Sequence, residues 1–176
     1  MSFLALFGSV VVLLIVALFR THLTGSRLSR LSWEELVAKL TPVETEGITT
    51  VALEYLHPSK GQLGMEPNVI WEKIGGSEGL ARMRANADVL IALAAYAQCW
   101  NFHEGVVVAE RMRHDGLALR RAARRITFGL VLGYGRVRGP FYVHEVASSY
   151  YLMRQRLLAL YETSHVGRYP QLAATL

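Results

Sequence analysis

The chain has very little cysteine, because Cys99 is the only one among 176 residues. A single cysteine excludes an intrachain disulfide framework, the usual support of small secreted domains. A phosphate-binding loop is also missing, since the glycine-rich stretch 129–139 is not followed by Gly-Lys-Ser/Thr and no strand precedes it. No base is placed beside Cys99 in the sequence. We therefore expect Cys99 to be a buried small residue of an alanine-rich helix.

The N-terminal region lacks charge altogether over eighteen residues, Ser2 to Phe19. As a helix this run rises about 27 Å, close to the roughly 30 Å of a bilayer core. A cleaved signal peptide would carry a basic segment before the apolar run and a small-x-small cleavage site after it, and neither is present. The sequence predicts a transmembrane anchor at 1–19, a juxtamembrane linker at 20–31 and a helical domain at 32–176.

Three basic residues, Arg20, Arg27 and Arg30, follow the apolar run, and no basic side chain precedes it. The positive-inside rule then places the C-terminal side in the cytoplasm and the short N-terminus outside. Sixteen of the nineteen basic residues are arginine, which is typical of GC-rich bacterial genomes. We expect a single-pass protein of the cell inner membrane.

The rest of the chain shows helical patterns throughout. Ser32 and Glu35 have the spacing of a capping box. Residues 46–56 fit both a helical face and a strand alternation, and we favour a helix because no partner strand is visible elsewhere. The expected helices cover 33–40, 46–56, 67–74, 78–102, 106–126 and 140–165. The predicted fold is all-α, with one transmembrane helix followed by a compact bundle of about five or six helices.

Basic charge is concentrated in the second half of the chain. Residues 20–88 carry eight basic and nine acidic groups, whereas residues 89–176 carry eleven basic and five acidic groups. If 106–126 is helical, Val108, Met112, Leu119, Ala123 and Ile126 form its core face. The opposite side then carries Arg113, Arg120 and Arg124, with Leu117 among them and with Arg121, Arg125 and His114 bordering them. Asp115-Gly116 is the place where this helix is expected to break or kink.

This basic face has four interpretations. The simplest is a solvated surface, since arginines on the outer side of a core helix are ordinary. The first functional one is docking onto an anionic membrane surface, because each Lys or Arg near such a surface contributes about 1 kcal/mol. The predicted contact residues are Arg113, Arg120, Arg121, Arg124 and Leu117. A protein or anionic-ligand partner is the third, and nucleic acid is the least supported, because the face lacks base-reading polar groups and stacking aromatics.

The histidines offer one weak metal motif. Glu162 and His165 form an E-x-x-H pair, the spacing with which helical bundles present di-iron ligands. That architecture requires a second pair, which the sequence lacks, so we predict no metal, no cofactor and no catalytic residues. The sequence favours a non-catalytic interaction, scaffold or accessory subunit whose partners are membrane lipids and an unidentified protein. The alternatives are a helical metal-binding or enzymatic domain using Glu162 and His165, and a membrane-tethered nucleic-acid binder.

Overall fold

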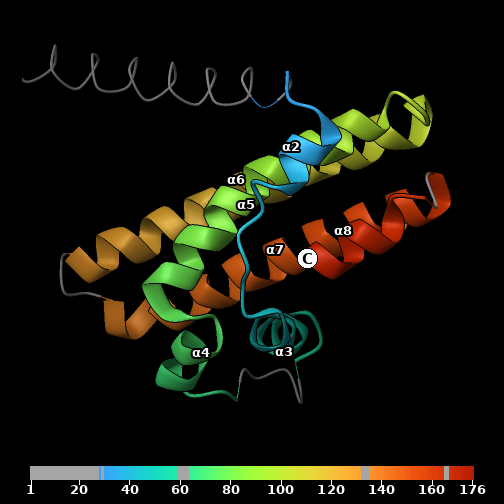
Figure 1. Ribbon diagram of the computed structural model, residues 1–176. Coiled ribbons are helices and arrows are strands. Elements are labelled where there is room, and N and C mark those ends of the chain that lie inside the picture. Colours follow the sequence, from blue (N-terminus) through green and yellow to red (C-terminus); the bar gives the residue numbers. More distant parts are fainter. Residues whose placement is uncertain (1–27, 29, 59–63, 132–134, 165–166) are drawn as a thin grey trace, which may run out of the picture.

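The computed structural model describes residues 28, 30–58, 64–131, 135–164 and 167–176, and within these ranges it contains seven helices and no strand (Figure 1). The predicted all-α fold is therefore confirmed. The helices are α2 (Trp33–Val37), α3 (Thr45–Leu56), α4 (Pro67–Lys73), α5 (Gly76–Ala97), α6 (Phe102–Val131), α7 (Gly135–Ser164) and α8 (Tyr169–Thr175).

The predicted anchor at 1–19 lies outside the described residues, as do Arg20 and Arg27 of the linker, whereas Arg30 is described and exposed. Among the helices that the structure does describe, none has both the length and the apolar character that crossing a membrane requires.

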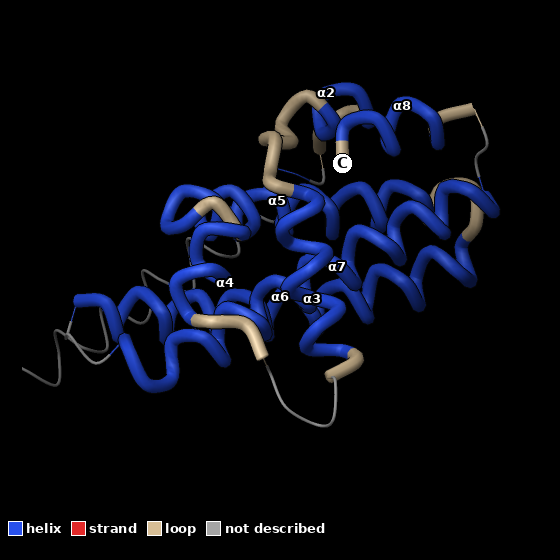
Figure 2. Tube along the Cα trace, turned by 90° about the horizontal axis from the view of Figure 1, so that it is seen from below, coloured by secondary structure: helices blue, strands red, loops and turns tan. Residues whose placement is uncertain are grey.

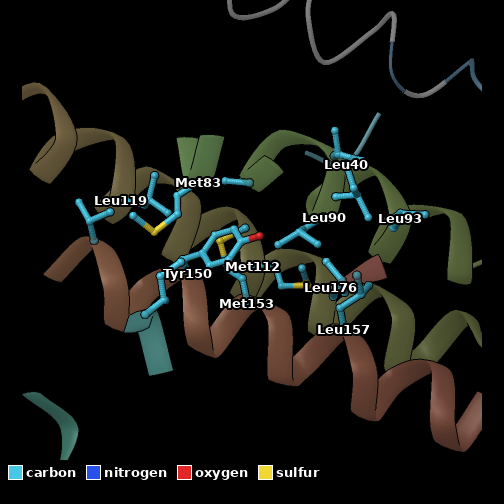
Figure 3. Close-up of a cluster of buried hydrophobic side chains, with 14 of the residues drawn as sticks. Leu40, Met83, Leu90, Leu93, Met112, Leu119, Tyr150, Met153, Leu157 and Leu176 are labelled. Atoms are coloured by element: carbon cyan, nitrogen blue, oxygen red, sulfur yellow. The ribbon is translucent and has the colours of Figure 1, made fainter. Parts of the chain in front are cut away.

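The long helices α5, α6 and α7 lie alongside one another, with α6 and α7 sharing the largest interface (Figure 1). Helix α3 is seen nearly end-on in that view, because it crosses α7. Short loops join α2 to α3, α4 to α5 and α5 to α6 (Figure 2). The centre of the core is a cluster in which Met83 and Leu90 of α5, Met112 of α6, and Met153 and Leu157 of α7 meet (Figure 3).

The apolar stripes that helical periodicity predicts form this core. In α5, Met83, Ala87, Leu90 and Ala94 are each 0% exposed. In α7 a stripe at helical spacing is also buried: Val143, Val146, Ala147, Tyr150, Met153, Leu157 and Tyr161. The favoured helix at 46–56 is confirmed as α3, which buries Ile48, Val51 and Ala52.

The predicted helix 78–102 is wrong at its end, because a turn at 98–101 separates α5 from α6. Asn101 starts the new helix. Its side-chain carbonyl accepts a hydrogen bond from the Glu104 N–H (3.3 Å) and its backbone carbonyl accepts one from the Gly105 N–H (2.9 Å). Cys99 lies in this turn and is exposed, which contradicts the buried position expected for it.

Helix α6 also runs unbroken through Asp115-Gly116, contrary to the expected break. Gly116 is buried against α5, and a Cβ atom at this position would lie 2.9 Å from Ile91 Cδ1. The glycine thus permits close approach of two helices. Pro140, expected to open the last long helix, lies inside α7, where its missing N–H removes a single intrahelical hydrogen bond.

A buried amide ties the segment after α2 to the long helices. Asn86 of α5 is 1% exposed. Its NH₂ group donates to the Thr41 carbonyl (2.7 Å) and to the Tyr150 hydroxyl oxygen (3.1 Å). Its carbonyl accepts hydrogen bonds from both the N–H and the hydroxyl of Thr41, each at 2.9 Å. Every polar atom of this side chain is therefore satisfied, which fixes the relative register of three segments.

The last helix, α8, was not predicted. Arg168, the residue directly before it, contacts three aromatic rings. The Arg168 guanidinium lies 4.9 Å from the ring centroid of Trp33, 5.1 Å from that of Trp100 and 5.8 Å from that of Tyr96. One of its nitrogens also lies 3.4 Å from the Glu34 carboxylate. Cation–π contacts with several rings fasten the start of α8 to α2 and to the end of α5.

Candidate functional site

One long face of α6 is exposed, because α5 and α7 cover the other sides of this helix. With about 100° of rotation per residue, seven exposed side chains spread along its length fall within one sector of about 100°. We call these seven the α6 outer face: Phe102, Val106, Arg113, Leu117, Arg121, Arg124 and Phe128. The exposed His103 and Glu110 lie in the same sector. Between the first and last of these residues the helix rises about 39 Å.

The hydrophobic side chains on this face are unusually exposed. Phe102 is 67% exposed, Phe128 65% and Leu117 49%. Isolated exposed apolar residues are ordinary, whereas a row of them along one helix face indicates an interaction surface. Leu117 was predicted for this face, and Phe102, Val106 and Phe128 were missed.

A signal for the missed residues is present in the spacing. Val106, Leu117 and Phe128 are separated by eleven residues each, and so are Phe102, Arg113 and Arg124. Eleven residues are close to three full turns of an α-helix, so each series keeps nearly one direction along the helix. The face therefore consists of one apolar row beside a row that begins with an aromatic residue and continues with two arginines, and Arg121 lies on the other side of the apolar row.

The arginines predicted for this surface do not behave alike. Arg121 and Arg124 are exposed, and each folds its Nε donor onto the carbonyl four residues earlier, at 3.3 Å. Arg113 is exposed as well and forms a 2.8 Å ion pair with Glu110 one turn before it. A surface pair of this kind contributes little to stability and is readily exchanged for another anion.

Arg120 is held by the neighbouring helix. It forms an ion pair with Asp88 of α5, and its side chain is 29% exposed. Burial, and then the positive charges of Arg84 and Arg124, lower the pKa of Arg120 below its ordinary value. The structure thus gathers Arg113, Leu117, Arg121 and Arg124 on one surface, whereas Arg120 fastens α6 to α5.

A buried acid–base pair was missed by the sequence reasoning. His144 of α7 is 1% exposed, and its Nε2 lies 2.8 Å from Oε2 of Glu54 in α3. Its Nδ1 lies 2.9 Å from the Pro140 carbonyl, which can only accept, so Nδ1 carries a proton. The two residues are 90 positions apart in the sequence. The pair links α3 to α7.

The remaining bonds of Glu54 show what this pair does. Its Oε1 accepts hydrogen bonds from the N–H groups of Gly64 (2.7 Å) and Met65 (2.8 Å). Burial raises the pKa of Glu54, but the hydrogen bonds from His144, Met65 and Gly64 together outweigh it, so the pKa lies below the ordinary value. All of these contacts stabilise the charged carboxylate in place, which is a structural role.

The weak metal motif does not come together in the structure. Glu162 is exposed on α7, and His165 lies outside the described residues. No cluster of three or more His, Cys, Asp or Glu side chains that could hold a metal ion occurs in the described ranges.

Comparison with known proteins adds no relationship: no protein-family model, no curated protein and no solved structure matches this chain.

Proposed function

We propose that this chain is a single-pass inner-membrane protein whose helical domain docks through the α6 outer face onto the anionic cytoplasmic leaflet, where it acts as a non-catalytic interaction or accessory subunit. The observation that carries the proposal is the alternation of exposed apolar residues and arginines along one face. Helices that lie in a membrane interface have this composition, with apolar side chains entering the acyl boundary and cations contacting headgroups. The uncharged run at Ser2 to Phe19 supports the anchor.

The expected energies are sufficient for docking of a domain that is already tethered. Each arginine near an anionic leaflet contributes about 1 kcal/mol, so Arg113, Arg121 and Arg124 together contribute about 3 kcal/mol. Full burial of a Phe side chain contributes about 1.5 to 3 kcal/mol. Phe102 and Phe128 are each about two-thirds exposed, so insertion of both rings adds about 2 to 4 kcal/mol on that scale.

The other interpretations of the face account for less of it. The interpretation as a purely solvated surface does not explain why the apolar rings of Phe102 and Phe128 are exposed. For nucleic acid, Phe102 and Phe128 correct the expectation that the face lacks aromatic side chains, but its seven residues still include no Asn or Gln to read base edges. A bilayer interface uses both the arginines and the apolar side chains.

The test measures the distance of this face from lipid. The full chain, carrying Cys99→Ser and Leu117→Cys, is labelled with a fluorophore and reconstituted into vesicles that contain spin-labelled lipid as a quencher. We expect strong quenching in vesicles rich in phosphatidylglycerol and weak quenching in pure phosphatidylcholine. High salt is expected to reduce the quenching, because it screens exposed charges.

A matched pair of triple variants separates this surface from net charge. Arg113→Glu, Arg121→Glu and Arg124→Glu together remove at least 3 kcal/mol, so docking weakens by about a hundredfold or more. Lys39→Glu, Lys73→Glu and Arg84→Glu change the net charge equally and should leave the quenching intact. Equal quenching in both triple variants excludes docking through this face.

The anchor and its orientation have a separate test. A reporter enzyme that works only in the cytoplasm, fused through a flexible linker after Leu176, should be active in cells, and the chain should stay with the membrane fraction after an alkaline wash. Activity of a reporter restricted to the outer side of the membrane would refute the orientation.

A further inference from the structure

A groove separate from the α6 outer face lies between α6 and α7. It has a volume of about 480 Å³, within the range of pockets that hold small molecules. From α6 it is lined by residues at positions 103, 104, 107, 108 and 111, and from α7 by positions 156, 159, 160 and 163. These are consecutive turns of each helix, so the groove follows the helices for about 12 Å.

The middle of the groove is apolar. Its walls there are Val107 and Val108 of α6 and Ala159 and Leu160 of α7. Thr163, nearby, already donates its hydroxyl proton to the Ala159 carbonyl (3.0 Å). A polar ligand would therefore lose hydrogen bonds to water here without replacement, whereas an alkyl chain would gain by leaving water.

One end of the groove is cationic. Arg111 of α6 and Arg156 of α7 line it, and a single carboxylate, Asp115, forms an ion pair with Arg156. Arg111 is exposed and forms no ion pair within the described ranges. Burial, and then the charge of Arg111, lower the pKa of Arg156, so the two guanidinium groups interact. Two cations thus face one anion, and one positive charge is left over.

The opposite end differs in character. Glu104 and His103 line it, and the Glu104 carboxylate accepts a hydrogen bond from the Asn101 side chain (2.8 Å). An anionic group is therefore disfavoured at this end and favoured at the arginine end. The two ends of the groove therefore differ in charge, and its apolar middle leads to a site for one negative charge at the arginine end.

We propose that this groove binds a single-chain fatty acid, with its alkyl chain along Val107, Val108, Ala159 and Leu160 and its carboxylate between Arg111 and Arg156. A carboxylate at this position accepts charge-assisted hydrogen bonds from two helices and balances the surplus charge. The inference goes beyond the proposed docking function and does not depend on it, because the groove residues are distinct from those of the α6 outer face.

The experiment uses the full chain in phosphatidylcholine nanodiscs and a decanoate analogue that carries a photoreactive diazirine near the end of its chain. After irradiation, the attached peptides are identified by mass spectrometry. We expect saturable labelling of the segments that contain Val107, Val108, Ala159 and Leu160. Unlabelled decanoate should compete, whereas decyltrimethylammonium and decanol should compete at least tenfold less well.

Two variants, each with a matched control, test the two parts of the site. Ala159→Trp fills the apolar channel at an exposed position and should abolish the labelling, whereas Ala81→Trp, on an exposed position of α5, should leave it unchanged. Arg111→Gln removes the unpaired cation and should raise the half-saturating concentration about tenfold. Arg84→Gln removes an exposed arginine of α5 instead, and it should have no effect. Circular dichroism confirms that each variant keeps its helices.

Several outcomes overturn the proposal. Labelling that persists in Ala159→Trp places the chain elsewhere. Equal competition by the cationic decyl compound refutes the role of the arginines. Competition by lysophosphatidylglycerol without competition by decanoate refutes a carboxylate ligand. None of these results bears on docking, which the quenching experiment measures through other residues.

Discussion

The buried pair of Glu54 and His144 makes the sharpest prediction about stability. Glu54→Ala removes a carboxylate that accepts hydrogen bonds from two backbone N–H groups and faces a histidine that is 1% exposed. Removing one partner of a buried ion pair typically costs 3 to 5 kcal/mol. The Glu54 side chain is itself 16% exposed and admits some water, so we expect a loss near the lower limit, about 3 kcal/mol.

Glu54→Gln provides a nearly isosteric comparison. Its amide oxygen can still accept from the Gly64 and Met65 N–H groups, and its NH₂ group can donate to Nε2 of a neutral His144. The hydrogen bonds are then kept and only the charge is removed, so the expected loss at neutral pH is about 1 kcal/mol. The free energy of unfolding of the full chain, obtained from urea titrations followed by circular dichroism, distinguishes the two substitutions.

The pH dependence has a defined sign. The pKa of Glu54 lies below its ordinary value of 4.5 in the folded chain. A carboxyl group of this kind stabilises the fold at pH values above its unfolded pKa, and this stabilisation is lost as the pH falls through the folded pKa. The difference between the wild type and Glu54→Gln should therefore shrink below about pH 4.5. A Glu54→Ala loss under about 1 kcal/mol, or a pH-independent difference for Glu54→Gln, would refute this reasoning.

Three further substitutions test the packing. Gly47→Ala would place Cβ 1.9 Å from the Lys73 carbonyl oxygen. Because backbone atoms must move, we expect a loss of about 2 to 3 kcal/mol in urea unfolding. Gly116→Ala comes too close only to the flexible end of Ile91, at 2.9 Å, and makes an ordinary contact with Met153 at 3.7 Å. It also gains up to about 1 kcal/mol of helix propensity. Its unfolding midpoint should hardly change, and a large loss would contradict this. Arg168→Lys removes the guanidinium that lies 4.9 Å and 5.1 Å from the Trp33 and Trp100 ring centroids, so thermal denaturation should show a loss of about 1 kcal/mol together with altered tryptophan fluorescence.

Features that depend on local chemistry could be predicted from the sequence. The Ser32–Glu35 capping box forms as its spacing indicates, with both reciprocal hydrogen bonds present. The apolar stripes of α5 and α7 are buried because a period of 3.6 residues directs them to one side. The exposed position of Leu117 among arginines follows from the same helical geometry.

Features that depend on how the helices pack against one another could not be predicted from the sequence. Arg120 counts as a surface arginine by its phase on α6, yet Asp88, 32 residues earlier in the sequence, holds it. Cys99 lies next to an apolar run, but the turn capped by Asn101 exposes it. Helix α8 has only seven residues, too few for a periodic signal, and it is held through Arg168.

The links between Glu54 and His144, Thr45 and Leu176, and Glu34 and Arg168 join residues that are 90, 131 and 134 positions apart. On a ribosome that adds about 5 to 20 residues per second, Glu54 waits about 5 to 18 s before His144 is synthesised. During this interval α2 can already pack on α5, whereas the apolar side of α3 lacks α7, with which it shares its largest interface. The order of synthesis therefore leaves the apolar side of α3 exposed until its main packing partner has been made.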